Sequence, residues 1–151
     1  MASMNISVGQ IAVGTRSDIL TTSGVGSCVV VVLYDRKQKV GAMAHALLSS
    51  AVDRSRPSPL DTQYVEAAID AMIAELGGGG AEKERLVAKL VGGANMFAEF
   101  GADIGARNVA AAREKLKAEG IEVVEECVGG VHGRSVEFCA ASGVMSVIGK
   151  F

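Results

Sequence analysis

Tryptophan is absent from this chain, and phenylalanine and tyrosine are so few that aromatic residues make up only 4% of it. Proline is also rare, with two among 151 residues, which argues against disordered linkers. The longest apolar runs, near 29–33 and 40–48, are far too short to cross a bilayer as a helix. What remains is a chain that is 49% hydrophobic. Its aliphatic residues and methionines are enough to build the core of one domain over residues 1–151.

Cysteine is scarce as well, and positive charge does not dominate. The three cysteines, at 28, 127 and 139, are odd in number and show no Cys-x-x-Cys spacing, so neither a disulfide framework nor a zinc site is predicted. A net charge of −2 and a pI near 5.7 argue against a nucleic-acid binder. The first residues lack the cationic start and apolar block of a secretory signal. We therefore expect a reduced, cytoplasmic protein that holds no metal or cofactor and is not inserted in a membrane.

The spacing of apolar residues predicts a single α+β domain with a mixed or antiparallel sheet and about two long helices. A polar loop at 49–60 contains both prolines, and loops of this length are often functional. The first helix, at 65–76, is expected to be capped by Asp61 or Thr62 and ended by the glycines at 77–80. The second helix spans 106–119 and ends at Gly120. Strands are expected at 6–13, 19–22, 28–34, 40–48, 86–91, 121–126, 136–140 and 144–148.

Cys28 is the most informative residue of the chain. It follows the glycine hinge Gly24-x-Gly26-Ser27 and precedes the unbroken apolar run at 29–33. Glycines let the main chain come close to a ligand and aim its N–H groups at it. Cys28 is therefore a candidate nucleophile, and Gly24, Gly26 and Ser27 are candidates for binding substrate or an oxyanion. The hinge lacks the full spacing of a dinucleotide-binding motif.

A thiol nucleophile needs a base, because a free thiol is mostly protonated at neutral pH. His45 and His132 are the only histidines. If residues 36–37 form a two-residue hairpin loop, counting back along both strands places Cys28 opposite His45. Directly opposed Cβ atoms lie about 4.5–5.5 Å apart, which is a workable distance for an S–H···N contact. A slightly longer loop would shift this pairing.

Structural roles remain open for these residues. A cysteine in a strand is often inert packing, and a lone histidine in an apolar segment is often a hydrogen-bonded core residue. The glycine hinge and the expected pairing favour the catalytic interpretation for Cys28 and His45. Cys127 and Cys139 are flanked by strand residues and are expected to be structural. His132, in a glycine-rich turn, is expected at the surface.

Five segments of the chain resemble the CheD family, the chemoreceptor glutamine deamidases of bacterial and archaeal chemotaxis. They appear in the family's order and cover nearly the whole chain, at 22–28, 44–48, 89–97, 104–108 and 129–134. Each segment alone is weak evidence, but the five together are specific.

This resemblance implies a Cys-His-Thr site like that of deamidating bacterial toxins of the cytotoxic necrotizing factor type, together with the cysteine-hydrolase fold of those toxins. Carried onto this sequence, the nucleophile is Cys28 and the base is His45. The third member is Thr22, six positions before the cysteine, and Thr21 is its neighbour.

The implied reaction is hydrolysis of a glutamine side chain of a methyl-accepting chemoreceptor to glutamate, with release of ammonia. The implied partners are the cytoplasmic helices of those receptors and a CheC-type phosphatase. Two alternatives from other classes stay open. One is another Cys-His hydrolase, such as a receptor methylesterase or a thioesterase; the other is a non-catalytic regulator that acts only by binding the phosphatase. The segment 96–100 is a candidate contact surface, although core packing is the simpler interpretation.

Overall fold

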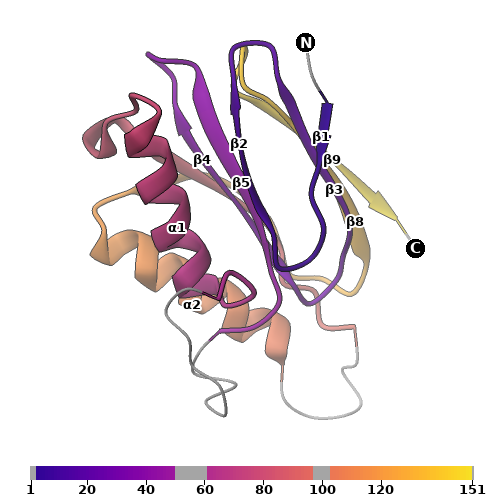
Figure 1. Cartoon of the computed structure of the whole chain (residues 1–151). Helices are drawn as coiled ribbons and strands as arrows, with labels where there is room; N and C mark the ends of the chain where they lie inside the picture. The colour runs from indigo at the N-terminus through magenta and orange to yellow at the C-terminus, as the bar shows by residue number, and fades with distance from the viewer. Residues whose placement is uncertain (1–2, 50–60, 97–102, 151) are drawn as a thin grey trace.

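The computed structural model describes residues 3–49, 61–96 and 103–150, and these form three layers (Figure 1). In chain order the elements are β1 (Ser3–Asn5), β2 (Ile11–Thr15), β3 (Ile19–Val25), β4 (Val29–Asp35), β5 (Val40–Ala46), α1 (Val65–Gly78), a 3-10 turn (Lys83–Arg85), β6 (Val87–Gly92), α2 (Ile104–Ala118), β7 (Glu122–Val128), β8 (Gly133–Cys139) and β9 (Val144–Lys150).

Two sheets and two helices make up the layers. The larger sheet has the strand order β2-β5-β4-β6-β7, and the smaller one β1-β3-β8-β9. The pairs β1–β3 and β6–β7 are parallel and the other pairs are antiparallel. Helices α1 and α2 cover one face of the larger sheet, and the smaller sheet packs on its other face (Figure 1). The predicted α+β architecture with a mixed sheet and two long helices is confirmed.

Strand β4 is the centre of the molecule, and all seven of its residues are buried. Val29, Val31 and Leu33 belong to the core beneath the helices. Val30 and Val32 belong to the second core, between the two sheets. A strand that is covered on both faces has no need for polar alternation, which explains the unbroken apolar run in the sequence.

Two expectations about the N-terminal half and the first helix are wrong. The segment 6–13 is not one strand, because a turn at residues 8–9 separates β1 from β2 and Gly9 there has a φ of +85°. Neither Asp61 nor Thr62 caps α1, since the N-cap residue is Tyr64, without a side-chain cap. Asp61 instead accepts a hydrogen bond from the Gln63 N–H, and the Thr62 hydroxyl donates to the Gly9 carbonyl.

The register of the β4–β5 hairpin also differs from the expectation. Asp35 pairs with Val40, and this places Val30 opposite His45. The expected direct pairing of Cys28 with His45 is therefore wrong. The loop has four residues rather than two, and each residue of β4 meets a partner two positions further along β5.

The side chain of Asp35 explains the longer loop. Its Oδ1 accepts hydrogen bonds from the N–H groups of Lys37 at 3.0 Å and Gln38 at 3.2 Å, and Lys39 closes the turn with a φ of 55°. A shift of two positions leaves every side chain on its predicted face, because side chains alternate with a period of two.

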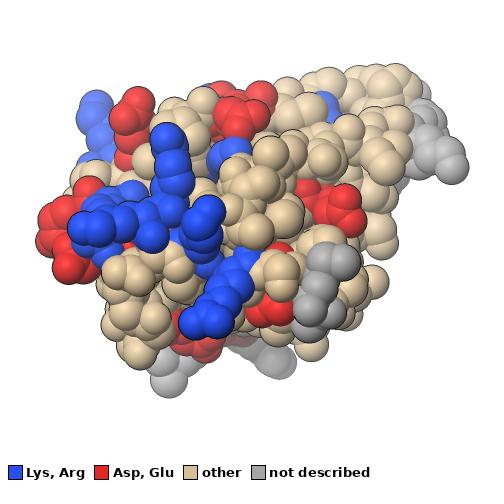
Figure 2. Space-filling model, turned by 90° about the horizontal axis from the view of Figure 1, so that it is seen from above, with Lys and Arg blue, Asp and Glu red and all other residues tan. Residues whose placement is uncertain are grey.

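The two ends of the sandwich differ in character. The hinge between β3 and β4 lies at the lower end in Figure 1. At the upper end, the β2–β3 and β4–β5 turns are joined by a hydrogen bond of 2.9 Å from the Arg16 N–H to the Lys39 carbonyl. These turns also carry Arg36 and Lys37, and all four basic residues are exposed. Figure 2 shows Lys and Arg side chains gathered on this end of the molecule.

Candidate active site

Thr22 and His45 meet between the two sheets. Thr22 lies on β3 and His45 on β5, and the Thr22 Oγ1 is 2.7 Å from the His45 Nδ1. The same hydroxyl donates its only hydrogen to the carbonyl oxygen of Ile6, at 2.9 Å, since a carbonyl can only accept. Nδ1 must therefore carry the hydrogen that it shares with Thr22. In the neutral ring this leaves a lone pair on Nε2.

The lone pair on the His45 Nε2 is not used elsewhere. Nε2 is buried and has no hydrogen-bond partner among the described residues. Burial also lowers the pKa of His45 below its ordinary value of 6.5, because removal from water disfavours the imidazolium. The ring is thus held as a neutral base at neutral pH.

Cys28 lies at the edge of the same space. Its carbonyl accepts a 2.8 Å hydrogen bond from the Gly93 N–H, which continues the β4–β6 pairing by one residue beyond Val29. Cys28 is thus the residue before β4, two positions ahead of Val30, which lies opposite His45. A residue that extends β4 by one position is the diagonal neighbour of His45 across the sheet. The structure brings Thr22 and His45 together and places Cys28 at the start of the strand that pairs with the His45 strand.

The Cys28 thiol is a protonated group in this setting. Its residue is only 7% exposed, and burial raises the pKa of the thiol, although the Cys28 N–H, lying against the sulfur, lowers it in part. A thiol with a raised pKa and an imidazole with a lowered pKa are both neutral at rest. Such a pair performs chemistry by moving the proton as the sulfur attacks.

The glycine hinge is shaped by the backbone. Gly24 has a φ of +68° at a point where the β3–β8 register shifts, and a Cβ there would meet nothing within 4 Å. Glycine is required at this position by the backbone conformation, since a side chain would have room. A Cβ on Gly26 would lie 3.3 Å from the side chain of Met96. In the described part of the chain, no main-chain carbonyl accepts a hydrogen bond from the N–H of Ser27 or Cys28.

Sequence reasoning missed the residues that hold this hinge in place. The Asn108 Nδ2 donates to the carbonyls of Ser27 and Leu47. Gly92 packs so closely that a Cβ would lie 2.3 Å from the Cys28 carbonyl oxygen. Arg134 in turn donates to the carbonyl of Gly92 at 3.2 Å. All three lie in segments singled out by resemblance, but their contacts join positions that are far apart in the chain.

The remaining cysteines and the second histidine lie outside this group. His132 is exposed, as expected, in the turn before β8. Cys127 pairs with Val91 across β6–β7 and packs against the inter-sheet core. Cys139 pairs with Ile19 on the other sheet, and hydrogen bonds from Ser142 lower its thiol pKa. All three cysteines are free thiols.

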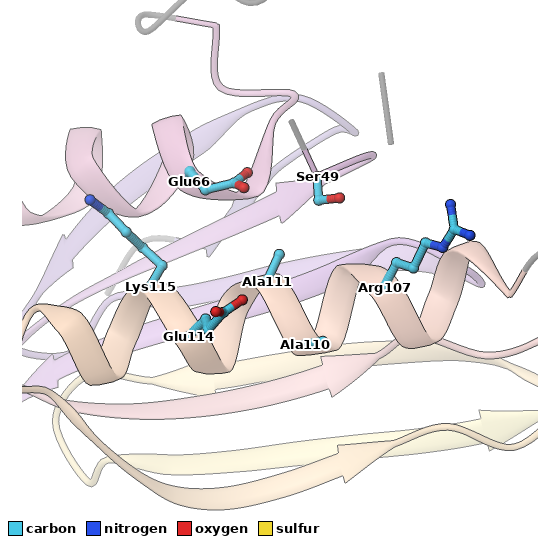
Figure 3. A pocket seen from close by; sticks show the side chains of 7 residues that line it. All are labelled: Ser49, Glu66, Arg107, Ala110, Ala111, Glu114 and Lys115. Carbon is cyan, nitrogen blue, oxygen red and sulfur yellow. The ribbon is translucent and has the colours of Figure 1, made fainter. Parts of the chain in front are cut away.

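A pocket of about 580 Å³ lies between the two helices, away from the thiol. Figure 3 shows its lining side chains, with Glu66 on α1 and Arg107, Glu114 and Lys115 spread along α2. Cys28, His45 and Thr22 do not line it. Two segments that the sequence singles out lie mostly outside the described residues. These are 50–60 of the polar loop and 97–100 of the candidate contact segment.

Over residues 3–49, 61–96 and 103–150, no three His, Cys, Asp or Glu side chains gather in a way that could hold a metal ion. No helix in these ranges is long and apolar enough to cross a membrane. The chemical groups that the described structure does bring together are a thiol, a neutral imidazole, a hydroxyl and free main-chain N–H groups.

The fold of this chain is shared by a solved structure of low sequence identity. The crystal structure of the Bacillus licheniformis hypothetical protein YfiH matches with a TM-score of 0.50 at 13% sequence identity, and the match covers 78% of this chain and 49% of that one.

A family model described as CheD chemotactic sensory transduction matches residues 47–148. The probable chemoreceptor glutamine deamidase CheD 2 of Geobacter metallireducens is 40% identical, over 95% of this chain and 91% of that protein. The chemoreceptor glutamine deamidase CheD of Thermotoga maritima is 41% identical, over 94% and 88% respectively. From the extent and identity of these matches, the chain belongs to the CheD family.

Proposed function

We propose that this protein is a chemoreceptor glutamine deamidase in which Cys28 is the nucleophile, His45 the base and Thr22 the residue that orients the base. The observation that carries the proposal is the hydrogen-bond arrangement at His45. Thr22 accepts the Nδ1 hydrogen and leaves the Nε2 lone pair unpartnered among the described residues, on the strand that pairs with β4, which begins directly after Cys28. The substrate is that of the relatives, which are named chemoreceptor glutamine deamidases.

In the first half of the reaction, Nε2 of His45 takes the proton of the Cys28 thiol as sulfur attacks the glutamine carboxamide carbon. The C=O electrons move to oxygen, and main-chain N–H groups of Cys28 and of the hinge at Gly24, Gly26 and Ser27 bind the resulting oxyanion. When the carbonyl re-forms, the C–N bond breaks. The imidazolium gives its proton to the departing nitrogen, so that ammonia leaves and a thioester remains.

The second half repeats the same movements with water. Nε2 removes a proton from a water molecule as its oxygen attacks the thioester carbon. The C–S bond then breaks, the sulfur regains a proton from the imidazolium, and the substrate side chain leaves as glutamate. Thr22 keeps the ring in the useful tautomer throughout, in the manner of a triad's third member. As a neutral hydroxyl, it stabilises the imidazolium less than a carboxylate would.

The proposed partners follow from this reaction and from the family. The substrate is the cytoplasmic helical region of methyl-accepting chemoreceptors, which places the protein in the cytoplasm. A CheC-type phosphatase is the proposed regulatory partner. The lack of a membrane-spanning helix in the described ranges is compatible with an enzyme that reaches the receptor from the cytoplasmic side.

The direct experiment incubates the purified protein with a receptor cytoplasmic fragment and follows each glutamine by peptide mass spectrometry. Wild type should produce the mass increase of amide-to-acid conversion, whereas folded Cys28→Ala and His45→Ala should not. Persistent conversion by Cys28→Ala would remove the cysteine mechanism. A fragment carrying a glutamate methyl ester, run in parallel, separates a deamidase from a methylesterase. If Cys28→Ala fully restores chemotaxis in cells, the protein is a binding regulator instead.

A further inference from the structure

Three consecutive carbonyls of the hinge are each held by a donor. The Ala94 N–H donates to the Gly26 carbonyl at 2.9 Å, and the Gly93 N–H donates to the Cys28 carbonyl at 2.8 Å. Both donors come from the backbone that follows β6. The middle carbonyl, that of Ser27, is held differently, because its donor is a side chain: the Asn108 Nδ2 of helix α2, at 2.8 Å.

The hydrogen bond to the Ser27 carbonyl also fixes the next N–H group. In a trans peptide the C=O and the following N–H point in opposite directions. When the Ser27 carbonyl points toward α2, the Cys28 N–H must point away from that helix. The Cys28 N–H is thus held on the side of the chain that faces away from Asn108.

Asn108 makes a second hydrogen bond, to the segment that follows His45. The same Nδ2 donates to the carbonyl of Leu47 at 3.0 Å, two residues after His45 on the chain. One amide nitrogen thus joins the segment that carries the nucleophile to the segment that carries the base. Since both acceptors are carbonyls, the amide can lie in only one orientation, with Nδ2 toward them.

The environment of Asn108 argues that its donors are the reason for its presence. The residue is fully buried, and its Oδ1 has no partner among the described residues. An unpaired buried acceptor lowers stability, and asparagine is a weaker helix former than alanine or leucine. An apolar residue would serve better if packing were the only requirement of this position.

We propose that Asn108 is a positioning residue, which aims the Cys28 N–H at the oxyanion and sets the spacing between the Cys28 hinge and the His45 strand. This inference rests on the proposed deamidase function. It predicts that Asn108 acts on the chemical step, through the hinge, and has little influence on substrate binding.

The test compares wild type with two variants that lack the Nδ2 donors. Asn108→Ala leaves the volume of the asparagine side chain empty, and Asn108→Leu fills it. Both variants should lower kcat for receptor-glutamine deamidation by about 10- to 100-fold, less than the 10²–10³ reported for outright removal of an oxyanion donor, while KM stays within about threefold. Alkylation of Cys28 by iodoacetamide at pH 9 should change by less than about threefold, because attack on a saturated carbon forms no oxyanion.

Leu116→Ala provides the stability control, since Leu116 is a fully buried core residue of the same helix. It should lower the melting temperature and leave kcat unchanged at temperatures where the protein is folded. The proposal is overturned if folded Asn108→Ala and Asn108→Leu keep wild-type kcat, or if kcat and alkylation fall together, or if neither variant folds. An inactive wild type would overturn the proposed function and this inference together, which distinguishes the two failures.

Discussion

At the scale of single residues, Thr22 connects three parts of the chain through one oxygen atom. It accepts the Nδ1 hydrogen of His45 and donates to the carbonyl of Ile6. The second bond is what makes the first one directional, because a hydroxyl with a free hydrogen could present either end to the ring. The tautomer of His45 therefore depends on the strand segment near Ile6 as well as on Thr22.

The first prediction concerns this hydroxyl. Thr22→Val keeps the shape of the side chain but removes its oxygen, so His45 loses both its orientation and its tautomer preference. We expect kcat for deamidation to fall by about 10- to 100-fold, a part of what a general base contributes. Thr21→Val on the opposite face of β3 is the matched control and should be nearly as active as wild type. A larger loss in the Thr21 variant would show that the third member is wrongly placed.

The second prediction concerns pH. Burial raises the pKa of the Cys28 thiol and lowers that of the His45 imidazole. The thiolate fraction of Cys28 should therefore keep rising as the pH passes 9.0, the ordinary pKa of a thiol. Deamidation should persist below pH 6.5, because protonation of His45 requires a lower pH than usual. Iodoacetamide alkylation mapped to Cys28, measured from pH 5 to 10, checks the first statement. A plateau in alkylation already at pH 6–7 would indicate a resting ion pair and contradict it.

At the scale of elements, the sequence predicts those features that depend on local pattern. The apolar run of β4, the helical spacing in α1 and α2, and the candidate pair Cys28 and His45 are all readable from neighbouring residues. The register of β4 and β5 is not, because a side chain, that of Asp35, builds the longer loop. The pair still shares a face, since the error in register is an even number of residues.

The support of the hinge shows the same limit. The contact of Asn108 with Ser27 spans 81 positions, and neither helical spacing nor strand alternation encodes it. The one available signal is a polar residue on the buried stripe of a helix, between Gly105 and Val109, which are also buried. Such a signal indicates that a buried partner exists and does not say where it lies.

The third prediction tests how tightly β6 packs on the hinge. In Gly92→Ala the new Cβ would overlap the Cys28 carbonyl oxygen and the Val25 side chain, at a residue whose φ is +111°. We expect the free energy of unfolding to fall by about 2–5 kcal/mol and kcat to fall by about 100-fold, through displacement of the thiol.

Gly120→Ala is the control for the glycine effect. Gly120 also has a positive φ, but a Cβ there would meet nothing within 4 Å. The free energy of unfolding of Gly120→Ala should fall by about 1–2 kcal/mol, and its activity should be that of wild type. Equal activity of the two variants, measured at a temperature where both are folded, would show that the hinge tolerates movement of β6.

At the scale of the whole molecule, the buried Asp35–Arg85 ion pair and the candidate active site lie at opposite ends of β4. Asp35 is fully buried at the basic end, where it accepts hydrogen bonds from Arg85 at 3.1 Å and from the Glu82 N–H at 3.2 Å. Burial tends to raise the pKa of this carboxyl, but the hydrogen bonds from Arg85 and nearby N–H groups outweigh it, so the pKa is lowered.

The fourth prediction follows from this separation. Asp35→Asn should lower the free energy of unfolding by about 1–3 kcal/mol at pH 7, since hydrogen bonds to a charged group are lost, while kcat of the folded enzyme stays unchanged. A group with a lowered native pKa stabilises above its unfolded pKa, and this stabilisation disappears as pH falls through the native value. The difference from wild type in urea titrations should therefore shrink toward acid pH. A clear loss of kcat would show that the two ends are coupled.

The central claim is that Cys28 and His45 act as one catalytic unit. The measurement that tests it most directly is a double-mutant cycle of deamidation rates on a receptor fragment, with Cys28→Ala, His45→Ala and the double variant. Residues that act together give non-additive losses. The account predicts that each single variant loses nearly all activity and that the double variant is no slower than the slower single one. Losses that multiply in the double variant would mean that thiol and imidazole work independently, and would contradict the account.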